Sequence, residues 1–257
     1  MRTPAISVRD LTIGYQDKTI LEHLTFDVPQ GQILAILGGS GCGKSTLLKH
    51  IIGLYDPLEG DVFLNGRSIV HADETERMGI MRSFGVAYQS GALFRSMSVF
   101  ENVALPMREF TDMSETEIRA RVERKLALVH LEHAGDLMPS DLSGGMIKRA
   151  AFARAMALDP QILFFDEPSA GLDPPAAAGL DELILSMREQ LGVTVVIVTH
   201  ELDSIFSVTD RVIIIDKAEK NIVAEGDPRK LKDGSPNQFV RDFLNRKGLK
   251  RSFTSHG

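Results

Sequence analysis

Several features that mark whole classes of proteins are missing from this chain. It has 257 residues but a single cysteine, Cys42, so no disulfide can form within it, and a reducing compartment is favoured. Since no run of about 18 apolar residues occurs, the sequence predicts no membrane-spanning helix. A net charge of −6 argues against a general nucleic-acid partner. The first residues are not followed by an apolar segment of the signal-peptide type, so we expect a cytosolic chain or one held at a membrane by a partner.

The strongest local pattern runs from residue 33 to residue 52. An apolar run, Ile33 to Leu37, breaks into a glycine-rich turn, and a helical pattern follows directly. This order is typical of the phosphate-binding loop, in which backbone N–H groups and a lysine hold the phosphates and a hydroxyl can ligate Mg²⁺. Cys42 is interpreted as a small filler without a redox role. The pattern predicts a nucleoside triphosphate site made of Gly38, Gly39, Ser40, Gly41, Cys42, Gly43, Lys44, Ser45 and Thr46.

The other apolar runs predict an α/β fold. Alternating patterns at 6–13 and 21–28 predict antiparallel strands at the N-terminus. Fully apolar runs at 33–37, 162–165 and 193–198 alternate with helical patterns, which indicates a mostly parallel core sheet covered on both faces. A terminal hairpin is expected at 211–215 and 221–224. Residues 71–83 are polar without a clear period, and we expect no regular element there.

Between about residues 90 and 160 the pattern changes to a mostly helical one. Ser114 and Glu117 form a capping-box pattern, and a second, alanine-rich helix is expected from Ile147 to Leu158. We expect a helical subdomain inserted between core strands. For the loop at its start two interpretations stay open: Phe94 and Phe100 pack in the core, or the loop forms a groove for a partner.

Polar residues come directly after several of the predicted core strands. Lys44, Asp166, Glu167 and His200 all stand at such positions, and the carboxyl ends of parallel strands meet in one crevice. Asp166 suits a carboxylate that holds a Mg²⁺ shell through water, and Glu167 can act as general base on the attacking water. His200 fits an orienter of Glu167 or a sensor of the γ-phosphate.

The segment Leu142 to Gly145 offers a second anion-binding device, since a serine hydroxyl and two glycine N–H groups open a helix there. A single bound nucleotide does not need both the phosphate loop and a second anion-binding segment in the same chain. We therefore expect the second segment to meet the nucleotide of another copy in a symmetric dimer.

These motifs together resemble the ATP-binding cassette (ABC) ATPase subunit over about residues 5–230. The resemblance implies a P-loop NTPase cassette with a RecA-like core, an N-terminal antiparallel β-subdomain and the inserted helical subdomain. We therefore expect an ABC ATPase domain at residues 1–235, with its helical subdomain at about 90–160, and a C-terminal extension at residues 236–257. Implied roles are adenine stacking for Tyr15, a Q-loop and metal role for Gln89, catalysis by Glu167 and His200, and metal binding by Ser45, Gln89 and Asp166. The signature residues Ser143, Gly144, Gly145 and Met146 would contact ATP across a homodimer, and Asp173 would belong to the D-loop.

Three stretches narrow the resemblance to the ATPases of Mla-type and Mce-associated lipid transporters. They are residues 89–94, residues 100–106 and the tail from Asn237. Met146, where most ABC ATPases have Gln, is similar to the same group, although a thioether replaces a good hydrogen-bonding group. The group implies permease subunits, an Mce-type lipid-binding protein, and a place on the cytoplasmic face of a bacterial inner membrane. The implied function is phospholipid transport between inner and outer membranes.

Two competing functions remain from the sequence. One is the ATPase of a polar-solute importer of the amino-acid type, from which only residues 90–94, Met146 and the tail distinguish the chain. The other is an ABC protein that acts on ribosomes or DNA, for which the chain lacks a second cassette, a long heptad run and a basic stripe.

Overall fold

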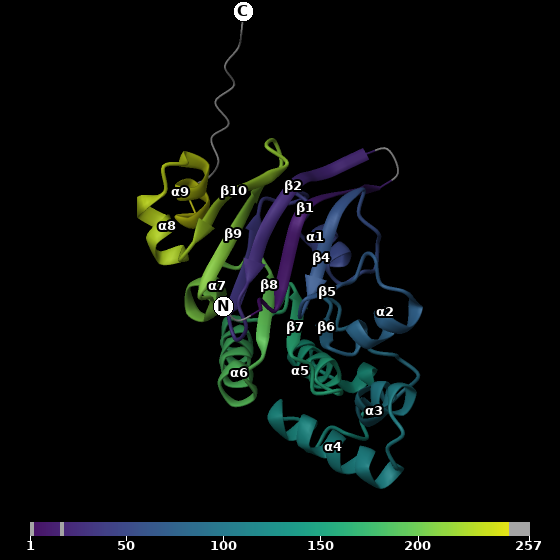
Figure 1. Ribbon diagram of the computed structural model, residues 1–257. Coiled ribbons are helices and arrows are strands. Elements are labelled where there is room, and N and C mark those ends of the chain that lie inside the picture. The colour runs from purple at the N-terminus through teal and green to yellow at the C-terminus, as the bar shows by residue number, and fades with distance from the viewer. Residues whose placement is uncertain (1–2, 16–17, 247–257) are drawn as a thin grey trace, which may run out of the picture.

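Two β-sheets form the frame of the molecule (Figure 1). The computed structural model describes residues 3–15 and 18–246. The first sheet is antiparallel, has the order β2-β1-β4-β5, and is built from β1 (Ile6–Tyr15), β2 (Lys18–Val28), β4 (Glu59–Leu64) and β5 (Arg67–Ser68). Asn65 and Gly66 both have positive φ, 50° and 78°, and they form the tight turn between β4 and β5. The predicted N-terminal antiparallel strands are confirmed.

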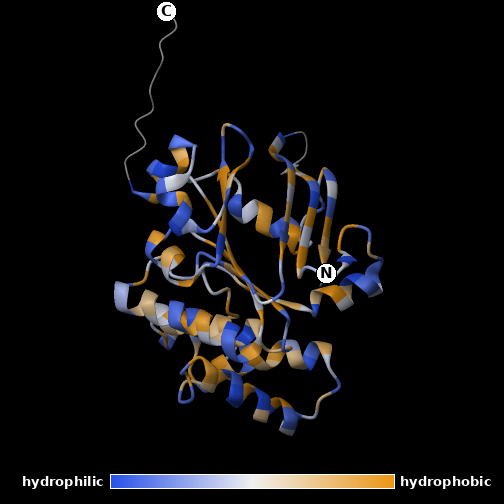
Figure 2. Ribbon diagram, turned by 60° about the vertical axis from the view of Figure 1, so that its left-hand side comes forward, coloured by the Kyte–Doolittle hydropathy of each residue, from blue (hydrophilic) through white to orange (hydrophobic). Residues whose placement is uncertain are grey.

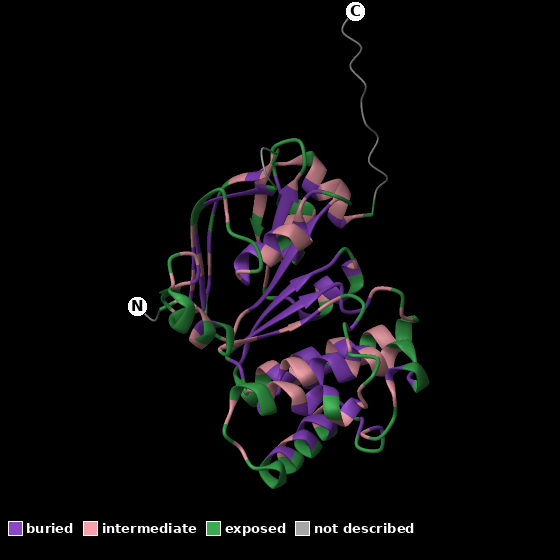
Figure 3. Cartoon of the chain, turned by 90° about the vertical axis from the view of Figure 1, so that its right-hand side faces the viewer, coloured by how far each residue is buried: buried purple, intermediate pink, exposed green. Residues whose placement is uncertain are grey.

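The second sheet has the order β10-β9-β3-β8-β7-β6. Only its edge pair, β9 with β10, is antiparallel; the other pairs are parallel. Its strands are β3 (Ile33–Gly38), β6 (Phe84–Ala87), β7 (Ile162–Asp166), β8 (Thr194–Val198), β9 (Arg211–Asp216) and β10 (Asn221–Gly226). Every residue of β3, β7 and β8 is buried, which explains why these strands appear in the sequence as continuous apolar runs. Figure 3 shows them as a purple core.

Helices cover this sheet and form the inserted subdomain. The core helices are α1 (Lys44–Ile51), α2 (Glu74–Met81), α6 (Pro174–Leu191), α7 (Leu202–Val208), α8 (Pro228–Gly234) and α9 (Gln238–Leu244). The subdomain consists of α3 (Val99–Phe110), α4 (Glu115–Leu128) and α5 (Gly144–Ala155), which lie together at the lower end of Figure 1. In Figure 2 hydrophobic (orange) and hydrophilic (blue) residues alternate along the helices at the lower end of the molecule. The helical insertion between β6 and β7 is confirmed.

Local details differ from the expectations in two places. The segment 71–83, expected to be irregular, contains α2, whose start is fixed by a capping box between Asp73 and Glu76. The alanine-rich helix α5 begins at Gly144 rather than at Ile147, because Ser143 caps it: its Oγ accepts from the N–H of Met146 at 3.3 Å.

The last described helix, α9, packs on the parallel sheet. Its Val240 and Leu244 are buried in a cluster with Ala35 and Leu37 of β3 and with Leu202 of α7. The elements that carry the phosphate loop and His200 therefore share one core with α9. The rest of the proposed C-terminal extension, residues 247–257, lies outside the described residues.

Candidate nucleotide-binding site

The phosphate loop follows β3 and closes on itself at the start of α1. Gly38 and Gly43 have φ of 153° and 107°, and a Cβ at Gly43 would lie 2.7 Å from the side chain of Ile20, so this position requires glycine. Lys44 Nζ donates to the carbonyls of Gly38 (2.9 Å) and Gly39 (3.2 Å). Its ammonium therefore lies across the loop, where the phosphates of a nucleotide would bind.

The loop opens into a pocket of about 450 Å³. The structure brings together there most of the residues that the sequence predicted as a site: Gly38, Gly39, Ser40, Gly41, Gly43, Lys44, Ser45, Thr46, Gln89, Glu167 and His200, joined by Phe243. Cys42 does not line it, because its side chain is buried in the core, where burial raises the pKa of the thiol. The interpretation of Cys42 as a filler agrees with this placement.

Two carboxylates stand at the end of β7, where Asp166 is the last residue of the strand and Glu167 follows it, and they contact different partners. Ser45 Oγ donates to Asp166 Oδ1 at 3.0 Å, and burial raises the pKa of Asp166 although this hydrogen bond opposes the shift. Glu167 Oε1 lies 2.8 Å from His200 Nδ1. Glu167 Oε2 is buried, and no described group donates to it. This oxygen is an acceptor without a partner, next to the place of the phosphates.

The signature segment does not reach this pocket. Ser143 and Gly144 are exposed, and none of the residues 143–146 lines the pocket. A Cβ on Gly144 would lie 3.5 Å from Leu172 in the D-loop, just before Asp173, so the signature and the D-loop are neighbours. The side chain of Met146 packs against the subdomain core. The two segments that the sequence predicts to bind anions are therefore separate within one chain.

Tyr15 lies beside the end of α1. Its ring is 43% exposed and meets Tyr55 edge to face, with the ring centroids 5.4 Å apart. His50, on α1, lies 6.4 Å from the Tyr15 ring. Tyr15, at the end of β1, is open to solvent and lies beside the helix that follows the phosphate loop, and an adenine platform needs both properties.

Two residues at the site escaped sequence reasoning. Phe243 of α9 is, among the described residues that line the pocket, the one with an apolar side chain. Lys148 of α5 is 7% exposed and donates to main-chain carbonyls behind the pocket. A lysine in a helix usually indicates a solvated face, so only the tertiary structure could reveal this one.

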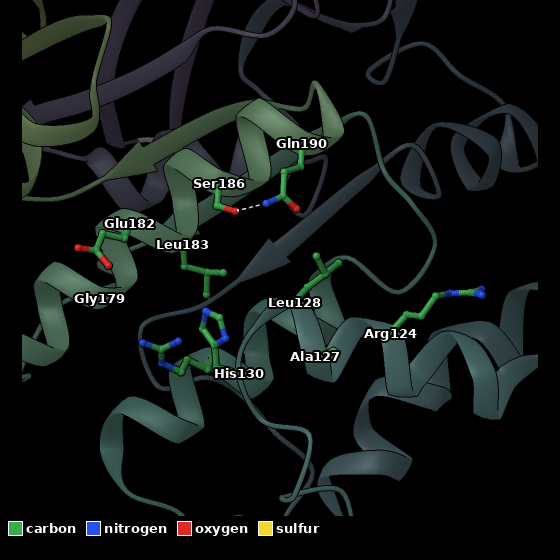
Figure 4. Close-up of a pocket in the computed structure, with 10 residues that line it drawn as sticks. Arg124, Ala127, Leu128, His130, Gly179, Glu182, Leu183, Ser186 and Gln190 are labelled. Atoms are coloured by element: carbon green, nitrogen blue, oxygen red, sulfur yellow. Dashed lines mark hydrogen bonds between the residues drawn. The ribbon is translucent and has the colours of Figure 1, made fainter.

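A second cleft, of about 690 Å³, lies between the subdomain and α6 (Figure 4). Leu183 of α6 and His130 point into it from opposite sides, and Arg149 of α5 donates to the carbonyl of Val129 at 3.1 Å. It shares no residue with the nucleotide pocket. The cleft lies at the boundary between the helical subdomain and the core domain, to which α6 belongs.

The fold and this pocket define the class of the chain as a phosphate-loop nucleoside triphosphatase with an inserted helical subdomain. A family model described as "ABC transporter" matches residues 21–170. The chain belongs to the ABC transporter family, and it is an ATP-binding, ATP-hydrolysing cassette.

Relatives and solved structures agree with this assignment. The chain is 42% identical over 241 residues to "Probable ribonucleotide transport ATP-binding protein mkl" of Mycobacterium leprae, covering 94% of this chain and 69% of the relative. It is 42% identical over 231 residues to "Intermembrane phospholipid transport system ATP-binding protein MlaF" of Haemophilus influenzae, covering 90% and 87%. The dimeric cassette MJ0796 bound to ADP and Pi is similar with a TM-score of 0.78 at 30% identity, covering 86% and 98%. Within the described part of the chain, no helix has the length and apolar character needed to cross a bilayer.

Proposed function

We propose that the chain powers phospholipid transport between the inner and outer membranes of a bacterium, as the ATPase subunit of an ABC transporter. Two copies would bind permease subunits and, with them, an Mce-type lipid-binding protein at the cytoplasmic face of the inner membrane. The likeness to MlaF over 90% of the chain supports the lipid cargo. The mkl relative, named for ribonucleotide transport, makes a ribonucleotide the second candidate cargo. Neither name supports an amino-acid importer.

Glu167 Oε2 is the observation that best supports a hydrolytic mechanism, with Glu167 as the general base. Because Oε1 is held by His200 and Oε2 has no donor among the described residues, Oε2 can accept the proton of a water that attacks the γ-phosphate. Lys44 would leave the carbonyls of Gly38 and Gly39 and donate to the phosphates. Tyr15 would stack on adenine.

The residues beside the phosphate site fit a magnesium ion. Ser45 and Asp166 offer hydroxyl and carboxylate oxygens, and Gln89 lines the same pocket. The described residues include no group of three or more His, Cys, Asp or Glu that could hold a metal, as expected where phosphates and water supply most ligands. Mg²⁺, when bound, would neutralise developing charge on the phosphates. Burial disfavours the ionised form of Asp166 and so raises its pKa. A cation bound nearby would stabilise the ionised carboxylate.

Glu167→Gln tests the base. We expect ATP affinity within about threefold of wild type and hydrolysis at least 100-fold slower, since an amide cannot take the proton. Glu182→Gln, the same change in the separate cleft, is the control and should keep wild-type turnover. Steady-state phosphate release and equilibrium ATP binding are measured together; unchanged hydrolysis in Glu167→Gln would remove Glu167 from this role.

The loop from Ser90 to Ser98 supports a permease partner. Phe94 is 51% exposed, so the interpretation that it packs in the core is wrong, whereas Phe100 does pack there. Hydrogen bonds hold the backbone of the loop: the buried Asn102 side chain accepts from the N–H of Phe94 (2.8 Å) and donates to its carbonyl (3.1 Å), and Arg154 donates to the carbonyl of Ala92 (2.7 Å). A groove of about 300 Å³, lined in part by Leu93 and Ile147, lies beside it.

Copurification tests both partner and cargo. The chain would be tagged, purified from native membranes, and its bound proteins and lipids identified by mass spectrometry. We expect a permease, an Mce-type protein and phospholipid. A periplasmic amino-acid receptor, or ribonucleotide as the bound cargo, would overturn the lipid proposal.

Phe94→Asp should abolish copurification of the permease, because it places a charge on the apolar contact surface. Phe110→Asp changes a similarly exposed phenylalanine, 42% exposed at the end of α3, and should retain the permease. Equal recovery with both variants would contradict the placement of the contact at Phe94.

A further inference from the structure

Lys148 contacts both loops that carry the catalytic groups. Its Nζ donates to the carbonyl of Glu167 at 3.1 Å and to the carbonyl of Gln89. Gln89 follows β6 and Glu167 follows β7, which pair in parallel with Ala87 opposite Phe165. The two loops therefore leave neighbouring strands side by side, and one ammonium group bridges their backbones.

The same lysine belongs to the signature helix. Lys148 stands five residues after Ser143, which caps α5. Because α5 begins at the signature, a shift of this segment moves Lys148 with it, and through two hydrogen bonds it moves the carbonyls of Gln89 and Glu167. The helix that presents Ser143 to another copy is thus linked to the catalytic groups of its own chain.

Burial makes this link costly to break. Lys148 is 7% exposed, and a buried ammonium needs acceptors for its N–H groups. Burial lowers its pKa, and the nearby carboxylates of Glu167 and Asp166 favour the charged form. Glu167 has φ of 49°, a region that glutamate seldom adopts, so its backbone depends on surrounding contacts to stay in place.

We propose that Lys148 is a positioning residue that joins the signature helix to the loops of Gln89 and Glu167, and so couples the two nucleotide sites of a dimer. The inference rests on the proposed dimeric ATPase. Engagement of Ser143 by the nucleotide of one copy then sets the position of Glu167 in the other copy's site. Lys148 acts on turnover and on cooperativity, and it does not touch the nucleotide.

The test replaces Lys148 by methionine, which fills similar space without a donor. We expect kcat to fall at least tenfold, the Kd for ATP to stay within twofold, and the Hill coefficient for ATP hydrolysis to fall to about 1. Lys148→Arg keeps donors and should restore most of the turnover and the cooperativity. Lys125→Met is the matched control, since Lys125 is 6% exposed but pairs with Asp159 away from the site; it should keep wild-type kcat and Hill coefficient.

Three results would overturn the proposal: wild-type kcat and Hill coefficient in Lys148→Met, equal losses in Lys148→Met and Lys125→Met, or a wild-type chain that hydrolyses ATP without cooperativity. Each leaves the ATPase assignment standing, which fails only if Lys44→Ala hydrolyses ATP at the wild-type rate. If Lys148→Met does not fold, Lys148→Gln tests the same link, because its shorter amide cannot bridge both carbonyls.

Discussion

Glu167 shows how a single residue can be specialised by its surroundings. Its N–H donates to the carbonyl of Val198 at 2.7 Å, its φ is 49°, and one of its carboxylate oxygens is hydrogen-bonded to His200. Strained backbone at such a position persists only where neighbours fix it, and it is common at functional sites. The carboxylate of Glu167 meets His200, whereas that of Asp166 meets Ser45, so the adjacent carboxylates have different partners.

Asp181 on α6 gives a prediction at this scale. Burial, as the main cause, raises its pKa to about 6 from 3.8, with the charge of Asp203 adding to the rise and a hydrogen bond from Ser204 opposing it. Between these values the native state holds more protons than the unfolded state, so the free energy of unfolding falls as pH rises through this window.

Asp181→Asn should remove that fall and stabilise the protein at pH 8 by about 1 kcal/mol, after allowance for partial exposure. Asp233→Asn, an exposed change of the same charge, should leave the pH profile as in wild type. Urea unfolding at pH 5 and pH 8 measures both variants. A wild-type slope in Asp181→Asn would contradict a raised native pKa.

At the scale of elements, the closest packing joins β6 to α5. A Cβ at Gly85 would lie 1.9 Å from the carbonyl oxygen of Ala155, so strand and helix meet backbone to backbone. This contact sets how near α5, with its signature and Lys148, approaches the sheet. The missing side chain of Gly85 therefore allows the short distance between β6 and α5.

Gly85→Ala should destabilise the fold by about 2 kcal/mol or more, because backbone atoms on both sides must move. Gly234→Ala in α8 meets no atom within 4 Å and is the control, expected within about 0.5 kcal/mol of wild type. Chemical denaturation gives both values. Equal stability of the two variants would show that β6 and α5 can separate freely.

The elements differ in how far the sequence predicts them. The phosphate loop, the core strands and α6 follow from local patterns, because burial on both faces and helix caps leave clear traces. α2 was missed since it is short and polar, although the spacing of Asp73 and Glu76 was the available capping signal. Lys148 and Phe243 could not be found, because only the packing of distant segments places them at the site.

At the scale of the whole molecule, the chain carries two parts of a site that do not meet. The pocket holds the phosphate loop, Gln89, Glu167 and His200, and Ser143 lies outside it beside the D-loop. A second copy would bring its Ser143 to the phosphates, and the solved cassette MJ0796, which the chain resembles, is dimeric. Hydrolysis would then depend on pairing, which a permease can control.

That two copies share each nucleotide is tested most directly by the molar mass of Glu167→Gln in solution. With MgATP, light scattering should give twice the 28.3 kDa of one chain, and one chain without nucleotide. Adding Ser143→Arg should abolish the dimer and leave ATP binding intact. A mass of one chain in Glu167→Gln while ATP is bound at saturation would contradict the shared site.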